Sequence, residues 1–222
     1  MEKLLIGILA MASVVVASNI LVQFLLLDGL LTWGAFTYPI AFLITDLMNK
    51  SYGPAAARKI VLAGFITGVL CSLIGSQIML QGDGYEYPAV ALRVAFASGV
   101  AFIIAQLFDI AVFNKLRSAE WWKAPLTSSL LASSVDTAVF FTLAFSAQVP
   151  FFSEVANEEI SWAWEIVPFL TFGTNSPLWV SLAIADLIVK WLIGLAALIP
   201  FRIFVSFFCR KIIKHLEIFL FC

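Results

Sequence analysis

Charged and amide side chains inside long apolar runs constrain this sequence more than any other feature. Residues 93–113 (RVAFASGVAFIIAQLFDIAVF) predict one helix whose 21 residues span about 30 Å, the thickness of a bilayer's hydrocarbon core. A carboxylate facing lipid there costs about 2.5–3.5 kcal/mol, so the polar face must meet other helices or a water-filled cavity. A helical wheel places Ser98, Phe102, Gln106, Asp109 and Phe113 on that face, and Ala101, Ile104 and Ile110 away from it.

Composition extends this conclusion to the whole chain. Of 222 residues, 62% are hydrophobic and only 12% are charged, against about 25% charged residues in a soluble domain, and the mean hydropathy is +1.02. The chain is therefore predicted to be an integral membrane protein. A net charge of −1 offers no basic surface for nucleic acid. Cys71, Cys209 and Cys222 have no paired spacing and predict neither a disulfide nor a metal site, and His215 is expected to be a solvated residue of the basic tail.

The fold class that we expect is an all-α membrane protein, a single domain over residues 1–222. Six spans are predicted at about 4–27, 33–48, 60–80, 93–113, 126–147 and 178–204. The first is too long for a signal-peptide core and is kept as a span. With both termini cytoplasmic, every lysine and arginine except Arg93 and Lys190 falls on the cytoplasmic side. The opposite loops carry Asp28, Asp83, Glu86, Glu154, Glu158, Glu159 and Glu165.

Local signals add detail to these spans. Pro39 predicts a kink in the second span, and residues 51–54 predict a tight cytoplasmic turn. In the long outer loop, 148–176, a short helix is expected to start at Ser153, with Val155, Trp162 and Ile166 on one side; it is either an interfacial helix or a lid over an outward-facing cavity. The sixth span is expected to open with Ser176 as N-cap and Pro177 as its first residue.

Polar stripes recur in the other spans. The fifth span aligns Ser129, Ser133, Asp136 and Phe140; the sixth aligns Trp179, Ala183, Asp186, Lys190 and Ala197; and the second ends with Thr45 and Asp46. Asp186 and Lys190 are four residues apart and can pair within their own helix. Two interpretations stay open: internal salt bridges that only fix helix packing, or a polar cavity that binds a ligand.

The ligand that suits such a cavity is small, polar and planar. The sequence supplies 21 phenylalanines and 7 tryptophans, and stacking a heterocycle on an aromatic ring contributes about 1–3 kcal/mol. A carboxylate can accept the two adjacent N–H donors of a guanine-like edge, while glutamine or asparagine can meet the remaining polar atoms. No phosphate loop, His-Glu-x-x-His motif or serine with a histidine base is present, so we expect neither an enzyme nor a bound cofactor.

Five stretches together resemble the bacterial vitamin uptake transporter (VUT) family, also called queuosine precursor transporters. They are residues 37–53 (TYPIAFLITDLMNKSYG), 93–117 (RVAFASGVAFIIAQLFDIAVFNKLR), 121–125 (WWKAP), 128–145 (SSLLASSVDTAVFFTLAF) and 173–190 (GTNSPLWVSLAIADLIVK). The resemblance implies a multi-pass importer of the bacterial inner membrane, with a fold like that of the substrate-binding subunits of energy-coupling-factor transporters. The implied substrates are 7-cyano-7-deazaguanine and its 7-aminomethyl form.

The alternative is a binding subunit that needs a separate ATP-driven module. The coupling mechanism stays open between proton coupling and facilitated uptake, and a homodimer is compatible with either. The expected partners are the deazaguanine and the lipid bilayer. For substrate binding we predict Phe102, Gln106, Asp109, Asp136, Phe140, Asn175, Trp179 and Asp186; for gating or charge balance we predict Asp46, Arg93 and Lys190.

Overall fold

The computed structural model describes residues 2–22, 24–27, 29–82, 86–149 and 153–220; side chains of residues 2, 3, 25 and 208–220 lie outside this description. Several sequence predictions therefore fall outside the described residues. Asp28 and Asp83 of the outer loops are two of them. The side chains of the basic tail, of His215 and of Cys209 are others, as is Cys222.

Five helices are long and apolar enough to cross a membrane within the part of the chain that the structure describes. They are α1 (Glu2–Leu21), α4 (Pro54–Gly75), α5 (Leu92–Leu116), α6 (Lys123–Phe145) and α8 (Leu178–Leu220). The ends of α5 and α6 lie close to the predicted spans, whereas α1 ends and α4 begins about six residues before the predicted positions. Helix α8 contains Pro200 and continues past the predicted end at residue 204 to Leu220. The chain is a largely helical, multi-pass membrane protein.

The second predicted span is two short helices rather than one. Helix α2 (Gly34–Thr37) ends before Pro39, and α3 (Ile40–Tyr52) begins directly after it, so the predicted interruption at Pro39 is confirmed. Proline has no backbone N–H and its ring clashes with the preceding turn, which explains the break. The 13 residues of α3 extend only about 20 Å, less than a bilayer's hydrocarbon core. A six-span count thus stays a prediction.

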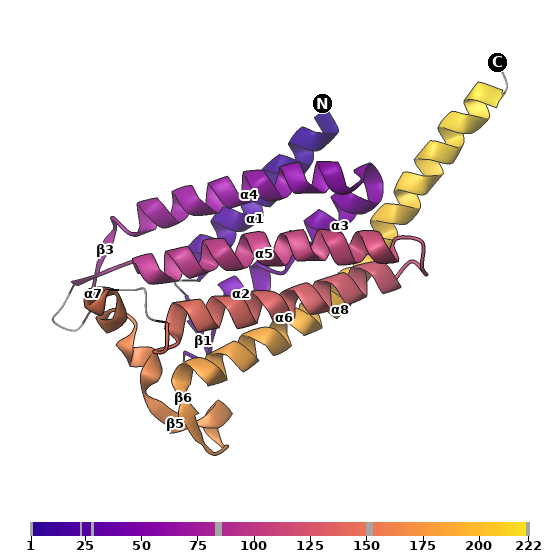
Figure 1. The fold of residues 1–222 in the computed structure, drawn as a ribbon. Helices are drawn as coiled ribbons and strands as arrows, with labels where there is room; N and C mark the ends of the chain where they lie inside the picture. Colours follow the sequence, from indigo (N-terminus) through magenta and orange to yellow (C-terminus); the bar gives the residue numbers. More distant parts are fainter. Residues whose placement is uncertain (1, 23, 28, 83–85, 150–152, 221–222) are drawn as a thin grey trace.

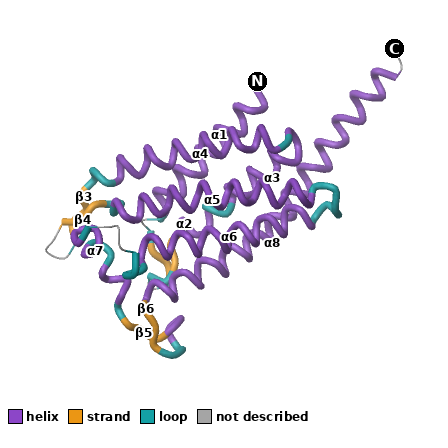
Figure 2. The backbone as a smooth tube through the Cα atoms, in the orientation of Figure 1, coloured by secondary structure: helices purple, strands orange, loops and turns teal. Residues whose placement is uncertain are grey.

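The long segments run in alternating directions along the bundle (Figure 1). At one end lie both termini, the α3–α4 turn at Gly53 (φ +85°) and the α5–α6 turn. The opposite end carries three two-stranded hairpins (Figure 2). They pair β1 (Leu25–Leu26) with β2 (Leu31–Thr32), β3 (Met79–Gln81) with β4 (Glu86–Pro88), and β5 (Ile166–Pro168) with β6 (Asn175–Pro177).

The segment between α6 and α8 differs in part from the prediction. Helix α7 (Glu154–Glu158) begins where expected, with the Ser153 hydroxyl accepting a hydrogen bond from the Ala156 N–H at 3.3 Å. It ends at Glu158, however, and a 3₁₀ turn (Ser161–Trp164) and β5 follow, so Val155, Trp162 and Ile166 do not share one helix. The predicted N-cap at Ser176 is wrong, because this residue belongs to β6 and α8 begins at Leu178.

Helix α5 lies at the centre of the bundle, packed against α3, α4 and α6. Phe102, Gln106, Asp109 and Phe113 of the predicted inward face are all buried. Ala101 and Ile110, predicted to lie away from that face, are buried as well, whereas Ile104 is exposed. The buried arc is wider than one stripe because neighbouring helices cover α5 on several sides.

Candidate functional site

Helix α6 carries a polar seam that joins two clusters of buried polar residues. Ser129, Ser133 and Asp136 follow one another at intervals of four and three residues, so all three lie on one face. All are buried against α3 and α8. Asp136 lies seven residues after Ser129, a rise of about 10 Å along the helix, and this rise sets the separation of the two clusters.

The first, which we call the Lys190 cluster, joins α6 and α8 (Lys190, Asp136, Asp186, Thr137 and Tyr38). The Lys190 ammonium lies 2.7 Å from the Asp136 carboxylate and 2.5 Å from that of Asp186. The Thr137 hydroxyl donates to Asp186 at 2.9 Å. The Tyr38 hydroxyl, from the break between α2 and α3, donates to Asp136 at 3.0 Å, and the Lys190 ammonium lies 5.3 Å from the Tyr38 ring centre.

This geometry confirms the predicted pairing of Asp186 with Lys190 within α8 and adds a second partner. One ammonium serves two carboxylates, so the cluster carries one excess negative charge when both are ionised. A buried ion-pair network of this kind fixes how α6 packs against α8, and such a network forms without any ligand. The Lys190 cluster alone therefore does not distinguish a binding site from a packing device.

The second, the Asp46–Asp109 cluster, lies between α3, α5 and α6 (Asp46, Asp109, Ser128 and Ser129). The Asp46 carboxylate accepts hydrogen bonds from Ser128 at 3.2 Å and from Ser129 at 3.1 Å. Asp109 is fully buried on the turn of α5 that faces Asp46, because hydrogen bonds from Thr45 to Gln106 and from Asn49 to the Ile110 backbone oxygen join α3 to α5 on either side of the two carboxyls. No donor among the described residues reaches either Asp109 oxygen with hydrogen-bonding geometry. Buried polar atoms are rarely left unpaired, so this cluster needs a further explanation.

Gln106 lies one helical turn before Asp109 on α5 and is also incompletely bonded. Its side-chain oxygen accepts a hydrogen bond of 2.6 Å from the hydroxyl of Thr45, the residue before Asp46. Its Nε2, a double donor, has no partner in the described part of the chain. Gln106 and Asp109 thus offer an unused donor and unused acceptors about 4.5 Å apart along the helix axis.

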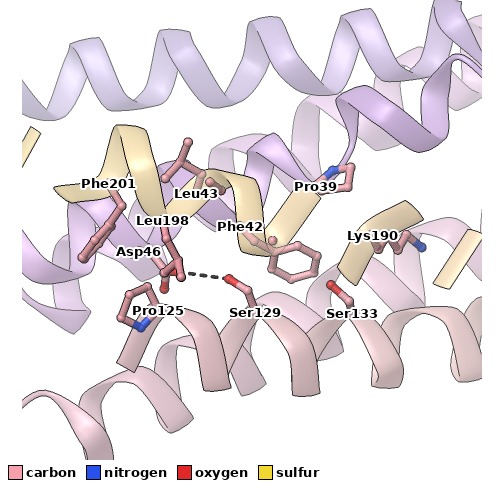
Figure 3. A pocket seen from close by; sticks show the side chains of 12 residues that line it. Pro39, Phe42, Leu43, Asp46, Pro125, Ser129, Ser133, Lys190, Leu198 and Phe201 are labelled. Atoms are coloured by element: carbon pink, nitrogen blue, oxygen red, sulfur yellow. Dashed lines mark hydrogen bonds between the residues drawn. The ribbon is translucent and has the colours of Figure 1, made fainter. Parts of the chain in front are cut away.

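A small pocket connects the two clusters between α3, α6 and α8 (Figure 3). Asp46, Ser129, Ser133 and Lys190 supply its polar wall, and Phe42 lies beside them. The cavity volume is about 10 Å³, which is room for about one water molecule. A bicyclic base does not fit this pocket as the side chains stand, so the conformation is closed here.

Three predicted substrate-binding residues lie away from both clusters. Phe140 packs edge-on against Phe141, with ring centres 5.1 Å apart, and Trp179 belongs to the same apolar cluster. Asn175 is exposed in the β5–β6 hairpin. Phe140 lies one turn after Asp136 on the same face of α6, but at that turn the neighbouring side chains are apolar.

Arg93 has a local structural role at the hairpin end of the bundle. Its guanidinium donates to the backbone oxygens of Leu143 at 2.9 Å and Ser146 at 2.6 Å, and to the side chain of Asn157. These bonds tie the start of α5 to the end of α6 and to α7. Gln106 lies 13 residues, or about 20 Å, further along α5.

The aromatic residues nearest the clusters include some that the sequence did not single out. Phe102 is buried among α1, α4 and α5, with its ring centre 6.2 Å from that of Tyr38. Phe42 lines the pocket one turn before Asp46 and meets Tyr38 edge-on at 6.1 Å. The four-residue spacing of Phe42 and Asp46 is a sequence signal for a shared face that could have found Phe42.

Sequence reasoning also missed three hydrogen-bonding residues of the clusters: Tyr38, Ser128 and Thr137. Ser128 and Thr137 adjoin Ser129 and Asp136 of the predicted stripe, so a wider stripe would have included both. Tyr38 reaches Asp136 across 98 positions of sequence, and no local pattern predicts that contact.

The fold and these clusters define a class: a multi-pass helical membrane protein whose bundle buries carboxylates, an amide and a lysine around one seam. A family profile described as putative vitamin uptake transporter matches residues 32–205, most of the chain. This chain belongs to the putative vitamin uptake transporter family.

Curated relatives carry related names. The chain is 39% identical over 141 residues to the queuosine precursor transporter of Escherichia coli, covering 60% of this chain and 64% of that protein. It is 37% identical over 131 residues to the probable queuosine precursor transporter of Haemophilus influenzae, covering 55% and 56%. The chain thus spans about three fifths of the length of these relatives. No solved structure matches it.

Proposed function

We propose that this chain imports queuosine precursors, 7-deazaguanine bases such as 7-cyano-7-deazaguanine, across the bacterial inner membrane. The observation that carries the proposal is the set of unpaired buried polar atoms on α5: Gln106 Nε2 and both Asp109 oxygens. Leaving such atoms without partners costs about 1–3 kcal/mol each, more for a charged group. A ligand that supplies the missing partners would recover that free energy on binding.

A deazaguanine has the complementary groups on one edge. Its ring N–H and exocyclic amine are adjacent donors that the Asp46–Asp109 carboxyls could accept, and its carbonyl oxygen is an acceptor for Gln106 Nε2. Phe42, beside Asp46, would offer a ring face to stack on, worth about 1–3 kcal/mol. These residues form the centre of the proposed site. Phe102 packs edge-on against the ring of Tyr38.

The Lys190 cluster would take part as the adjoining wall. Lys190 and Asp46 line the same pocket, so a base seated beside Phe42 would contact both clusters. Because the pocket now holds about one water, α3 must separate from α6 and α8 to admit the base. The break at Pro39 gives α3 a natural hinge for that movement.

Transport also requires a topology, and the proposal includes six crossings with both ends of the chain in the cytoplasm. Support comes from charge: Lys50, Arg58, Lys59, Lys115, Arg117 and Lys123 lie at the end with the termini, and Glu86, Glu154, Glu158, Glu159 and Glu165 lie at the hairpin end. In this arrangement α2 and α3 together make the second crossing, its outer part contributed by α2 and the turn at Pro39.

The test uses bacteria blocked in making the precursor and lacking their own uptake system. Cells that express this chain should regain queuosine in their tRNA from micromolar external 7-cyano-7-deazaguanine. Asp109→Asn should not restore it, whereas Glu120→Gln, a change at an exposed residue of the α5–α6 turn, should. Equal protein levels in the membrane are the control. No recovery with the unaltered chain would contradict the proposal.

A binding subunit that needs an ATP-driven module is distinguished by reconstitution. The purified chain alone in lipid vesicles should take up the base. Uptake that begins only when a separate ATP-hydrolysing module is added would support the alternative instead.

A further inference from the structure

Asp46 and Asp109 are two buried carboxyl groups on facing turns of α3 and α5, between the Thr45–Gln106 hydrogen bond (2.6 Å) and the hydrogen bond from the Asn49 amide to the Ile110 backbone oxygen (3.3 Å). Both side chains are almost completely inaccessible, at 1% and 0% exposure. Two ionised carboxylates cannot remain in contact in a dry interior, because each charge is already costly there and the two repel each other. Either a cation or a proton must lie between them.

The surrounding helices supply no such cation among the described residues. From α8, Lys190 lines the same pocket as Asp46, but its ammonium is bound to Asp136 and Asp186. On α3 itself, the Lys50 ammonium donates to the Arg117 backbone oxygen at 3.4 Å. Directly after α5, Arg117 donates to the Asn49 side chain and to the Lys50 backbone oxygen, and Lys115 of α5 is exposed. On α4, Arg58 and Lys59 are exposed; α1 has no titratable side chain after Lys3; and α6 offers only the hydroxyls of Ser128 and Ser129.

The hydrogen bonds indicate where a proton would be held. Asp46 accepts from two hydroxyls, as an ionised carboxylate does, whereas neither Asp109 oxygen has a hydrogen-bond donor among the described residues. A neutral Asp109 that donates its own O–H to Asp46 satisfies both groups, and the pair then keeps a single negative charge. Gln106 Nε2, unpaired one turn away, marks the adjoining position where a polar ligand would sit.

We propose that Asp46 and Asp109 together form a proton-binding site, and that one proton enters the cell with each substrate molecule. This inference rests on the proposed import function. The proton is bound from the outer side with the base, and the pair's remaining carboxylate oxygens accept the base's N–H donors. After the base leaves, the Asp109 O–H bond breaks and the proton passes to cytoplasmic water. The two carboxylates, now both ionised, stay apart and hydrated until a proton bound from the outer side brings them together again.

The test is proton counting in lipid vesicles that contain the purified chain. With the interior one pH unit more alkaline and no membrane potential, one proton per substrate sustains at most about a tenfold accumulation of 7-cyano-7-deazaguanine. When substrate is added outside, a pH-sensitive dye trapped in the vesicles should report acidification of the lumen. The number of protons that enter should equal the number of substrate molecules taken up. A sodium gradient in place of the pH gradient should give no accumulation.

Variants locate the site. Asp46→Asn and Asp109→Asn should each lose the gradient-driven, roughly tenfold accumulation, while Glu120→Gln should retain it. If either variant fails to fold, the proton count of the unaltered chain still decides. Uptake to equal concentrations with no proton movement, or accumulation driven by sodium, would overturn the proton site and leave import standing. No binding and no uptake under any gradient would overturn both.

Discussion

Lys190 is bonded to two carboxylates from two helices, and this makes it the residue whose loss should cost the most stability. Asp136 and Asp186 lie 2.7 and 2.5 Å from its ammonium, in surroundings that exclude nearly all solvent. Removing one partner of a buried ion pair leaves the other uncompensated, a loss of about 3–5 kcal/mol.

Lys190→Gln should therefore lower the thermal unfolding midpoint in detergent by roughly 6–20 °C, at about 2–4 °C per kcal/mol for a chain of this size. Asp136→Asn should cost less, because Lys190 keeps Asp186. The variant that carries both Lys190→Gln and Asp136→Asn should lose less stability than the sum of the two single losses, since both residues belong to one ion-pair network. A Lys190→Gln protein as stable as the unaltered chain would show that the ion pairs do not hold α6 to α8.

Asp109 should behave in the opposite way. Its oxygens accept no hydrogen bond from the described residues, and the amide of Asp109→Asn keeps the shape of the side chain and can donate an N–H to Asp46 in place of the carboxyl O–H. We expect the free energy of unfolding to stay within about 1 kcal/mol or to rise, and uptake to be lost. Thermal unfolding and uptake measured on the same preparation test this, with Asp136→Asn as the matched carboxyl-to-amide control. Retained uptake, or loss of folding, would contradict the assignment.

Among the elements, the segment from α2 to α3 shows what the sequence can and cannot reveal. Pro39 predicted the break, because proline's effect on a helix is local. The inward orientation of Gln106 followed from helical spacing on α5, and Asp46 was picked out as a charged residue at the end of the second span. The contacts of Tyr38 with Asp136 and of Lys190 with Asp136 did not, because tertiary packing alone brings together residues 98 and 54 positions apart.

Arg93 joins helix α7 to the start of α5 and the end of α6. Arg93 bonds the backbone oxygens of Leu143 and Ser146 and the side chain of Asn157. Arg93→Ala should cost several kcal/mol, since bonds to a charged group contribute about 1.5–3 kcal/mol each, and should speed proteolysis near α7. Asn157→Ala removes one of these three hydrogen bonds and should therefore cause a smaller loss of stability and a smaller increase in proteolysis. Equal cleavage of Arg93→Ala and unaltered protein would contradict this role.

For the whole molecule, charge separates the two ends of the bundle. Basic residues gather at the end with both termini, and acidic residues gather at the hairpin end. The test places one new cysteine in a chain whose Cys71, Cys209 and Cys222 are replaced by serine. The Glu158→Cys variant of that chain should react with an impermeant thiol reagent added outside the cell. Arg58→Cys should react only after the membrane is opened. The reverse pattern, or labelling of both from one side, would contradict the six-crossing topology.

At this scale the membrane helices were predictable because hydropathy is local and bilayer thickness fixes helix length. Span ends shifted where hairpins formed: residues 79 and 80 were expected at the end of a span but belong to β3, and Ser176, the expected N-cap, lies in β6. Of the candidate site, the buried acidic residues, Gln106 and Lys190 were found and Tyr38, Ser128 and Thr137 were missed, while Asn175, Phe140 and Trp179 lie away from both clusters. Spacing along one helix cannot tell how far an inward face stays polar.

The central claim is that the Asp46–Asp109 cluster and Gln106, whose polar atoms are partly unpaired, recognise a guanine-like edge. Equilibrium binding to the purified chain tests this claim most directly. Calorimetry should compare 7-cyano-7-deazaguanine with the matching 7-cyano-7-deazaadenine, which lacks the ring N–H donor and the carbonyl oxygen. We predict that the guanine-type base binds about 10- to 100-fold more tightly, the discrimination expected of one well-placed bidentate contact, and that Asp109→Asn abolishes this preference. Equal affinity for the two bases, or a preference that survives Asp109→Asn, would contradict the account.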